Sequence, residues 1–578
     1  MAPDGAVTPR GVGAATVTAE YQGRSATVAI KVSSPTVNAP ASLSLRPARL
    51  TLGSGQTGTL DALARGPGGK IIDDPSLQWR SSDTEVIAVE SGRLVAGRSG
   101  EAIVTATMGD LSSSATISVV ASQVPPSEAL NRAFPDAEGF GAEALVRCDR
   151  SNVQILRVTT TASTGPGSLA SVLDQVDGNR LTLVLFAVGG TINGGVELRS
   201  GCVYLAGQTA PGDGIQVIGL NGNVAFRVDR FDATSDVVVR YMRFRSTKGG
   251  AGAQDAVSVH GGARMMFDHL SVQFGNDEVF SVEPVATNGA SAADITISNT
   301  IIAAGLMPHS TGSLFMSPKS NESLSTSGLS LHRNLWSHNS HRNPAMGRLY
   351  DVQIVNNVMY NWKGNVGRMD RGTRADVIAN TFLAGPWTTA NGREDRIFQH
   401  DTLGALSSVY LEGNVARPYQ PSPGGNQRVM VKYLAGGGLL PDEAYVEHRH
   451  AQPAVPLTVV GADQAATAIL DEAGASRRLA CDGSWVAARD PLDTRIVADV
   501  RAGTGPSQDS EMDHPSDLGG SPSLSAGTPC PDDDEDGMPN AYEARFEFDP
   551  LDAADASQDA DGDGYLNIEE YLNGSEPR

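Results

Sequence analysis

Two 12-residue windows near the C-terminus place acidic residues at the spacing that calcium-binding loops use. The windows contain Asp532, Asp534, Asp536 and Glu543, and then Asp559, Asp561, Asp563 and Glu570. In such a loop the carboxylates at positions 1, 3, 5 and 12 surround the ion, and a glycine at position 6 makes the sharp turn. Two complete matches 27 residues apart predict two calcium sites, and the alternative is a solvated acidic tail.

The charge of the chain restricts its partners. The formal net charge is −22, and residues 528–578 alone hold 16 acidic and 2 basic residues. This balance does not favour nucleic acid as a partner, because nucleic-acid binding requires a basic surface. A polyanionic polymer would need cations or local arginines in order to bind. No run of about 18 apolar residues occurs, so we expect no membrane span.

A repeating pattern of short apolar strands fills the middle of the chain. The strands are 236–244, 264–272, 294–302, 328–336, 351–360, 375–383 and 407–415, and Asn or His lies at or near the corner each time, at His269, Asn299, Asn334, Asn357, Asn380 and Asn414. Steps of about 23 to 35 residues indicate a solenoid, and strands that are apolar on both faces are typical of parallel sheets. We predict a parallel β-helix whose corner asparagines bond the neighbouring coil, with a β-sandwich as the alternative.

Several motifs in this region resemble the pectate lyase family. They are AFPDAEGFG (133–141), TGPGSL (164–169), LAGQTAPGDGI (205–215), VVRYMRFR (238–245), FDHLSVQFGNDEV (267–279) and LHRNLWSHNSHRNP (331–344). The similarity extends over residues 130–578. It implies a right-handed parallel β-helix that cleaves uronate polymer by β-elimination.

The resemblance also implies how the reaction proceeds. A cation on the substrate carboxylate stabilises the charge that develops when the C5 proton is lost, and in this family an arginine takes that proton. The arginine of the family's R-x-P motif falls on Arg342, and two of the family's acidic calcium ligands fall on Asp255 and Asp277. We therefore expect Ca2+ as the cofactor.

Other family positions are only partly matched. The acidic ligand four residues after Asp277 is replaced by Ser281, for which Glu278 or Glu283 would compensate. The family's substrate-binding lysine is absent from the stretch that begins at His309. Candidate substrate-binding residues are His309, Arg348 and Arg368. Further basic residues expected near the groove are Arg240, Arg243, Arg245, Lys363, Arg371 and Arg374.

The N-terminal region repeats a different pattern. Residues 13–32 and 100–119 both alternate apolar and polar residues around a central turn, as β-hairpins do. The run at 83–110 resembles the bacterial Ig-like group 2 family, and the C-terminal loops resemble EF-hand-like or thrombospondin type 3-like segments. Cys148 with Cys202 and Cys481 with Cys530 would suit an extracellular protein, although four free thiols are the alternative.

These patterns together predict an all-β chain. We expect a partial Ig-like module (1–33), an Ig-like module (44–121), a linker (122–132), the β-helix (133–464), an extension packed on it (465–527) and a short α-helical calcium-binding tail (528–578). We expect further sequence upstream of Met1, secretion or cell-surface attachment, and a monomer. The expected activity is calcium-dependent cleavage of plant-wall pectate. The alternatives are another uronate polymer, a β-helix glycosidase, or a non-catalytic carbohydrate-binding or adhesion protein.

Overall fold

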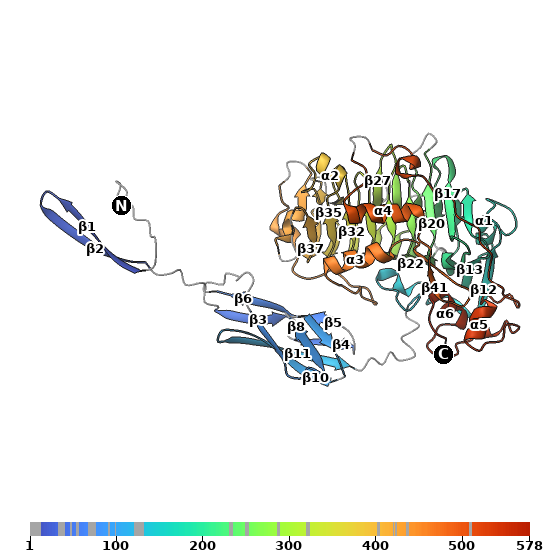
Figure 1. Cartoon of the computed structure of the whole chain (residues 1–578), viewed down its shortest axis with the longest axis horizontal. Coiled ribbons are helices and arrows are strands. Elements are labelled where there is room, and N and C mark those ends of the chain that lie inside the picture. The colour runs from blue at the N-terminus through green and yellow to red at the C-terminus, as the bar shows by residue number, and fades with distance from the viewer. Residues whose placement is uncertain are drawn as a thin grey trace. The chain divides into compact units, whose positions relative to one another are not determined.

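The fold comes from a computed structural model of the 578-residue chain, which forms two compact units, residues 1–125 and 126–578. Each unit is considered by itself (Figure 1). The structure describes residues 13–32, 41–46, 49–53, 57–66, 77–90, 93–98, 100–120, 132–229, 235–248, 254–285, 290–318, 324–401, 405–419, 421, 425–434, 438–507 and 511–577. The linker predicted at 122–132 lies, except for Arg132, outside these residues.

The first unit consists of antiparallel hairpins and small sheets. Its strands are β1 (Gly13–Tyr21), β2 (Arg24–Val32), β3 (Ser42–Arg46), β4 (Arg49–Gly53), β5 (Thr57–Thr59), β6 (Asp61–Arg65), β7 (Gln78–Ser81), β8 (Ile87–Glu90), β9 (Arg93–Ala96), β10 (Gly100–Met108) and β11 (Leu111–Val120). The two sequence repeats form the hairpins β1–β2 and β10–β11. Strands β4, β11, β10 and β7 make one sheet, and Ile87, Leu94, Val104 and Ile117 are fully buried. Assignment of this unit to the Ig-like group 2 family stays a prediction.

Three long parallel sheets make the second unit a right-handed parallel β-helix. The first sheet contains β12 (Asp149–Val158), β13 (Arg180–Phe186), β16 (Val203–Ala206), β19 (Ser235–Arg240), β22 (Gly262–Asp268), β25 (Ala292–Ser298), β28 (Thr326–His332), β31 (Leu349–Val355), β34 (Arg374–Ile378) and β37 (Ser408–Glu412). The second contains β14 (Gly190–Asn193), β17 (Ile215–Gly219), β20 (Arg243–Ser246), β23 (Ser271–Gln273), β26 (Ile301–Ala303), β29 (Leu335–Ser337), β32 (Val358–Tyr360), β35 (Thr381–Leu383) and β38 (Val415–Arg417). The third contains β15 (Val196–Leu198), β18 (Phe226–Val228), β21 (Val257–Val259), β24 (Glu278–Val282), β27 (Thr311–Met316), β30 (Ala345–Gly347), β33 (Gly367–Asp370), β36 (Phe398–His400) and β39 (Val431–Tyr433).

Asparagines stack along one corner of the coils, between the first and second sheets. The backbone N–H of Asn334 donates to Asn357 Oδ1 at 2.9 Å, that of Asn357 to Asn380 Oδ1 at 2.9 Å, and that of Asn380 to Asn414 Oδ1 at 3.0 Å. His269 lies one place earlier, at the left-handed residue of its corner, where φ is 53°. Asn299, where φ is 47°, lies at the equivalent left-handed position, and the backbone N–H of Thr300 is the one that donates to Asn334 Oδ1, at 3.0 Å. The predicted corner ladder is therefore present from Asn334 to Asn414, but His269 and Asn299 are not members of it.

Helices and short turns surround the sheets. The α-helices are α1 (Leu169–Leu173), α2 (Pro386–Ala390), α3 (Ala462–Glu472), α4 (Pro491–Ala502), α5 (Asn540–Arg545) and α6 (Asn567–Asn573). The 3-10 turns are η3 (Phe140–Glu143), η4 (Gly207–Thr209), η5 (Leu220–Gly222), η6 (Gln427–Met430), η7 (Asp442–Ala444), η8 (Pro515–Leu518) and η9 (Asp555–Ser557), and β40 (Arg477–Leu479) pairs with β41 (Trp485–Ala487). Ile469 of α3 and Ile496 of α4 join a buried cluster with Ile301 and Leu335 of the second sheet. No helix among the described residues is long and apolar enough to cross a membrane.

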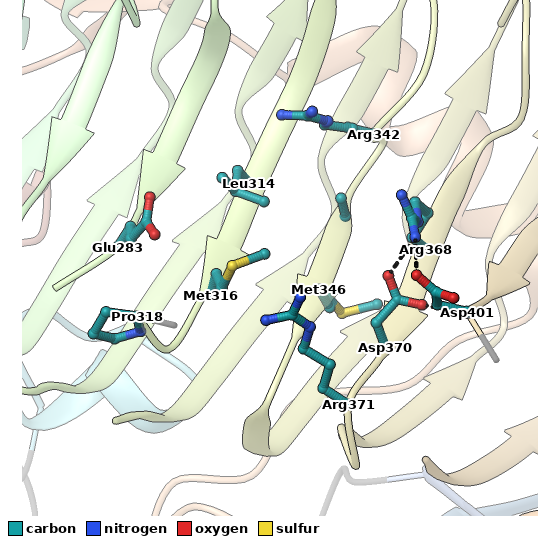
Figure 2. A pocket seen from close by; sticks show the side chains of 11 residues that line it. Glu283, Leu314, Met316, Pro318, Arg342, Met346, Arg368, Asp370, Arg371 and Asp401 are labelled. Atoms are coloured by element: carbon teal, nitrogen blue, oxygen red, sulfur yellow. Dashed lines mark hydrogen bonds and ion pairs between the residues drawn. The ribbon is translucent and has the colours of Figure 1, made fainter. Parts of the chain in front are cut away.

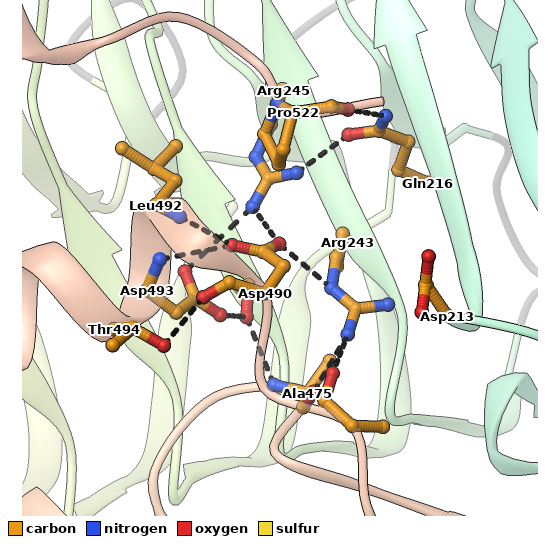
Figure 3. A network of polar contacts seen from close by, with 12 residues as sticks. Asp213, Gln216, Arg243, Arg245, Ala475, Asp490, Leu492, Asp493, Thr494 and Pro522 are labelled. Carbon is orange, nitrogen blue, oxygen red and sulfur yellow. Dashed lines mark hydrogen bonds and ion pairs between the residues drawn. The ribbon is translucent and has the colours of Figure 1, made fainter. Parts of the chain in front are cut away.

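A buried ion-pair network attaches the segment before α4 to the second sheet (Figure 3). Asp490 Oδ2 lies 3.0 Å from Arg243 Nε and 2.6 Å from Arg245 Nη2. Arg245 also donates to Gln273 Oε1 at 2.8 Å. The expectation that Arg240, Arg243 and Arg245 lie near a substrate groove is wrong. Arg243 and Arg245 are buried and paired in this network, and Arg240 is buried and paired with Asp268 at 2.9 Å.

Two disulfides cross-link the second unit. Cys148 is bonded to Cys202 and Cys481 to Cys530, and the described residues include no free cysteine. The first joins the residues that precede β12 and β16, which are separated in the first sheet by β13. The second ties the start of the acidic tail to the β40–β41 turn. The alternative of four free thiols is wrong.

Candidate active site

Three acidic residues converge at one end of two strands of the third sheet. Asp255 and Asp277 come shortly before β21 and β24, and Glu278 begins β24. Because these strands are paired neighbours, one ligand oxygen from each carboxylate lies within 4.8 Å of the others. The backbone N–H of Glu278 donates to Asp255 Oδ1 at 3.0 Å. Asp255, Asp277 and Glu278 are named the groove cluster below.

The groove cluster holds more negative charge than its surroundings neutralise. Burial, followed by the charges of Asp255 and Asp277, raises the pKa of Glu278 to about 9, although Arg342 opposes the shift. Burial also raises the pKa of Asp255, against hydrogen bonds from serine hydroxyls. A divalent cation would offset this excess charge, and an all-oxygen set of donors suits calcium. The residues present therefore fit a calcium ion.

Arg342 reaches the groove cluster from the segment between β29 and β30. Its guanidinium forms an ion pair with Glu278. A Cβ atom at Gly312 would lie 2.7 Å from the carbonyl oxygen of Arg342, so a residue without a side chain is required for this close approach. Burial, and then the charge of Arg342, lowers the pKa of His341 to about 4, so its ring is neutral at neutral pH.

Arg342 also lines an open pocket of about 420 Å³ over the third sheet (Figure 2). The other lining residues are Glu283, Leu314, Met316, Pro318, Ala345, Met346, Arg368, Asp370, Arg371 and Asp401. Arg368 lies 2.9 Å from Asp370 and 3.3 Å from Asp401. The pocket thus contains cationic groups that could bind an anionic polymer. Two carboxylates, those of Asp370 and Asp401, already orient one of these cations, Arg368.

The structure separates the three residues predicted to bind substrate. Arg368 lines the pocket, and His309 Nδ1 is in hydrogen-bond contact with the carboxylate of Asp277 in the groove cluster. Arg348 instead donates to the backbone carbonyl oxygens of Pro318 and Leu324, at 2.9 Å each, and is not among the described residues that line this pocket.

Glu278 supplies the acidic side chain that Ser281 lacks at a family ligand position. Ser281, the uncharged residue at a family ligand position, donates its hydroxyl to Asp255, and Glu278 supplies the third carboxylate of the groove cluster. Of the two residues considered as compensating for Ser281, Glu278 joins the cluster, whereas Glu283 lines the pocket. Sequence reasoning missed Asp370 and Asp401. The alternation of Arg368 and Asp370 on β33 was a usable signal for the former, because residues two apart share a face.

The eight acidic residues predicted in the tail form groups of unequal burial. Asp532, Asp534 and Asp536 lie together, and Asp536 belongs also to a group with Glu543. Asp559, Asp561 and Asp563 lie together and are more exposed. Glu570 is nearly fully buried, and burial, followed by these aspartates, raises its pKa to about 8.

Comparison with known proteins gives a consistent set of relatives. No family model matches the sequence. The chain is 34% identical over 453 residues to the probable pectate lyase C of Neosartorya fischeri, which covers 77% of this chain and 94% of that protein. It is 32% identical over 451 residues to the probable pectate lyase C of Emericella nidulans, covering 77% and 93%. A solved Bacillus subtilis pectate lyase mutant matches at 13% identity and a TM-score of 0.38, over 60% of this chain and 98% of that one.

Proposed function

The chain belongs to the pectate lyase family of polysaccharide lyases, and on this premise we propose that it cleaves α-1,4-linked galacturonan by β-elimination with calcium as its cofactor. The observation that carries the proposal is the meeting of the groove cluster with Arg342 at a pocket that also contains Arg368 and Arg371. The acidic groups could bind the calcium ion that the reaction requires, and the arginines could bind the carboxylates of an anionic polymer.

The groove cluster is the proposed means of making the C5 proton of the substrate easier to remove. The proton on C5 of a galacturonate is α to a carboxylate and is only weakly acidic, so its removal requires local neutralisation of charge. Calcium held by Asp255, Asp277 and Glu278 would supply that neutralisation as a Lewis acid. Glu278 binds a cation only after losing its own proton, because its pKa lies near 9 without one.

Arg342 is the proposed base. A guanidinium is ordinarily protonated, so it accepts a proton only where neighbouring cationic charge favours the neutral form. Arg342 forms an ion pair with Glu278, which stabilises its protonated form. Engagement of Glu278 with a cation would weaken that ion pair and leave Arg342 available to the C5 proton. His341 beside it is neutral at neutral pH and does not supply that cationic charge, so bound calcium would have to supply it.

Arg368 and Arg371 are proposed to bind uronate carboxylates along the pocket. Arg368 is held in place by Asp370 and Asp401, which leaves its planar fork oriented before substrate arrives. His309 is proposed to influence substrate binding through Asp277, with which it is paired. Arg348 is not included in this role, since its guanidinium is occupied by backbone carbonyl oxygens.

We place the protein outside the cytoplasm, because two disulfides suit an oxidising compartment and an extracellular polymer is the proposed substrate. The β-helix covers its own core, which supports action as a monomer.

A panel of uronate polymers tests the proposed activity. The purified full chain is incubated with polygalacturonate, methylated pectin and alginate, with calcium or with chelator, and the ultraviolet absorbance of unsaturated product is followed. We expect product from polygalacturonate only with calcium. If only another polymer gave product, that polymer would replace polygalacturonate as the assigned substrate. No product from any polymer would support a non-catalytic binding protein, and reducing ends without absorbance would indicate a glycosidase.

A further inference from the structure

Several buried carboxylate oxygens in the acidic tail have no hydrogen-bond partner in the part of the chain that the structure describes. Asp532, Asp534 and Asp536 each accept one backbone N–H, at 3.0, 3.2 and 2.7 Å. The other oxygen of each, and both oxygens of Glu543, are buried without a hydrogen bond among the described residues. Glu543 itself is fully buried. Buried anionic oxygens without partners are costly, so this arrangement favours a cation-binding site over a solvated acidic surface.

A fifth carboxylate reaches the same place from outside the 12-residue window. One oxygen of Asp555, in η9, lies within 4.8 Å of ligand oxygens of both Asp536 and Glu543. Asp555 is 7% exposed, and its Oδ1 is also buried without a hydrogen bond. Its Oδ2 accepts the backbone N–H of Asp549 at 3.1 Å, which fixes the direction of the side chain. No loop pattern would assign a ligand at this position.

We infer that Asp532, Asp534, Asp536, Glu543 and Asp555 form a calcium site, in which Asp555 connects the first acidic loop to the segment that leads to the second. Oxygen donors alone and this many carboxylates suit calcium, since magnesium usually keeps several waters and takes only one or two carboxylates.

The position of this site gives it a structural consequence. A Cβ atom at Gly537, where φ is 98°, would lie 2.9 Å from Leu185 Cδ1 of β13, so the loop packs directly on an early coil of the β-helix. Asp532 also forms an ion pair with Arg157 of β12. Met538 and Tyr542 are buried in the same cluster as Leu185. Calcium at the site therefore holds the tail against the β-helix.

Hydrogen exchange on the full chain, measured by mass spectrometry with calcium chloride or chelator, tests this inference. We expect calcium to slow amide exchange in residues 530–557 at least tenfold. Glu543→Gln and Asp555→Asn should each remove most of that protection. Asp533→Asn is the matched control, because Asp533 is an exposed aspartate in the same loop that lies outside the ligand groups. It should keep the wild-type response.

The outcomes separate the tail site from the groove. Asp255→Asn should leave the calcium response of residues 530–557 intact even if it abolishes lyase activity. Wild-type protein whose tail exchanges equally fast with calcium and chelator would overturn the inference without any variant. Asp555→Asn with a full calcium response would overturn the assignment of Asp555. If a variant unfolds, faster exchange throughout β13 and β16 will reveal it. Calorimetric calcium titration of wild-type and Asp255→Asn protein then shows whether calcium binds outside the groove cluster, and no binding by the Asp255→Asn protein would overturn the inference.

Discussion

At the scale of single residues, Glu278 has one ion-pair partner and a second, proposed one. It pairs with Arg342, and it belongs to the groove cluster, where it would also bind calcium. Its high pKa shows that the arginine alone does not neutralise Asp255, Asp277 and Glu278 together. Competition for this one carboxylate would couple cofactor binding to the availability of the base.

Arg342→Lys should abolish most lyase activity while leaving the fold intact. A lysine keeps the charge but loses the planar fork and the reach to the C5 proton, and positioned general bases contribute about 100-fold to 10,000-fold in rate. The measurement is kcat on polygalacturonate at saturating calcium. Arg374→Lys is the control, because Arg374 is 43% exposed, pairs with Asp351 and lies outside the pocket. Near-native activity of the Arg342 variant would show that another residue is the base.

The calcium requirement should fall as pH rises toward 9. Calcium must displace a proton from Glu278, so the calcium concentration for half-maximal activity should decrease by up to about tenfold per pH unit between pH 7 and 9. The folded-state pKa lies above the unfolded one, so calcium-free protein should also lose stability over this rise. Glu278→Gln should flatten the dependence and Glu283→Gln should not. A requirement independent of pH in wild-type protein would contradict the role of Glu278.

At the scale of elements, the segment that begins α4 is tied to the second sheet by charge as well as by apolar packing. Arg245 and Arg243 lower the pKa of Asp490 in spite of its burial. The same aspartate caps α4, accepting the backbone N–H groups of Leu492 and Asp493 at 2.9 Å each. One side chain thus serves both the helix and its attachment.

Asp490→Asn should destabilise the β-helix unit by about 3–5 kcal/mol, because two buried arginines lose their shared counter-charge. Asparagine is itself a good N-cap, so loss of the cap would not account for the effect. Chemical unfolding followed by tryptophan fluorescence measures it. Asp463 lies on α3 and forms an exposed ion pair with Arg417 of β38. Asp463→Asn should therefore lower the free energy of unfolding by less than about 1 kcal/mol. Equal effects of the two substitutions would show that the buried network adds no stability.

At the scale of the whole molecule, the two units have separate cores. The buried cluster of the first unit draws on residues between Leu45 and Val119, and the large clusters of the β-helix begin at Ala133. Their sheets do not share strands among the described residues. The proposed reaction uses residues of the second unit alone.

A chain beginning at residue 126 should therefore fold and keep its activity. We expect kcat/KM on the preferred uronate within about twofold of the full chain, because domains with their own cores fold independently. The thermal midpoint of the β-helix transition should also be unchanged. A loss of activity above tenfold, with the fold retained, would show that the first unit contributes to substrate binding.

The sequence by itself predicted the features that depend on short stretches of chain. Apolar strands with Asn corners specified the coils, because parallel strands bury both faces and the Asn357 side chain donates to the backbone of the preceding coil. The spacing of acidic residues in each tail loop was also visible, since a 12-residue pattern is local. The matched motifs predicted the candidate base at Arg342.

Only the tertiary structure decided which charges meet. Arg245 pairs with Asp490 across 245 positions, so no local pattern could distinguish it from a groove arginine. Glu278 joins the groove cluster because β21 and β24 stack in register, and Asp555 joins the tail site because its chain folds back onto Glu543. Burial then determines how strong each of these electrostatic interactions is, because a buried charge interacts with its neighbours more strongly than a solvent-exposed charge does.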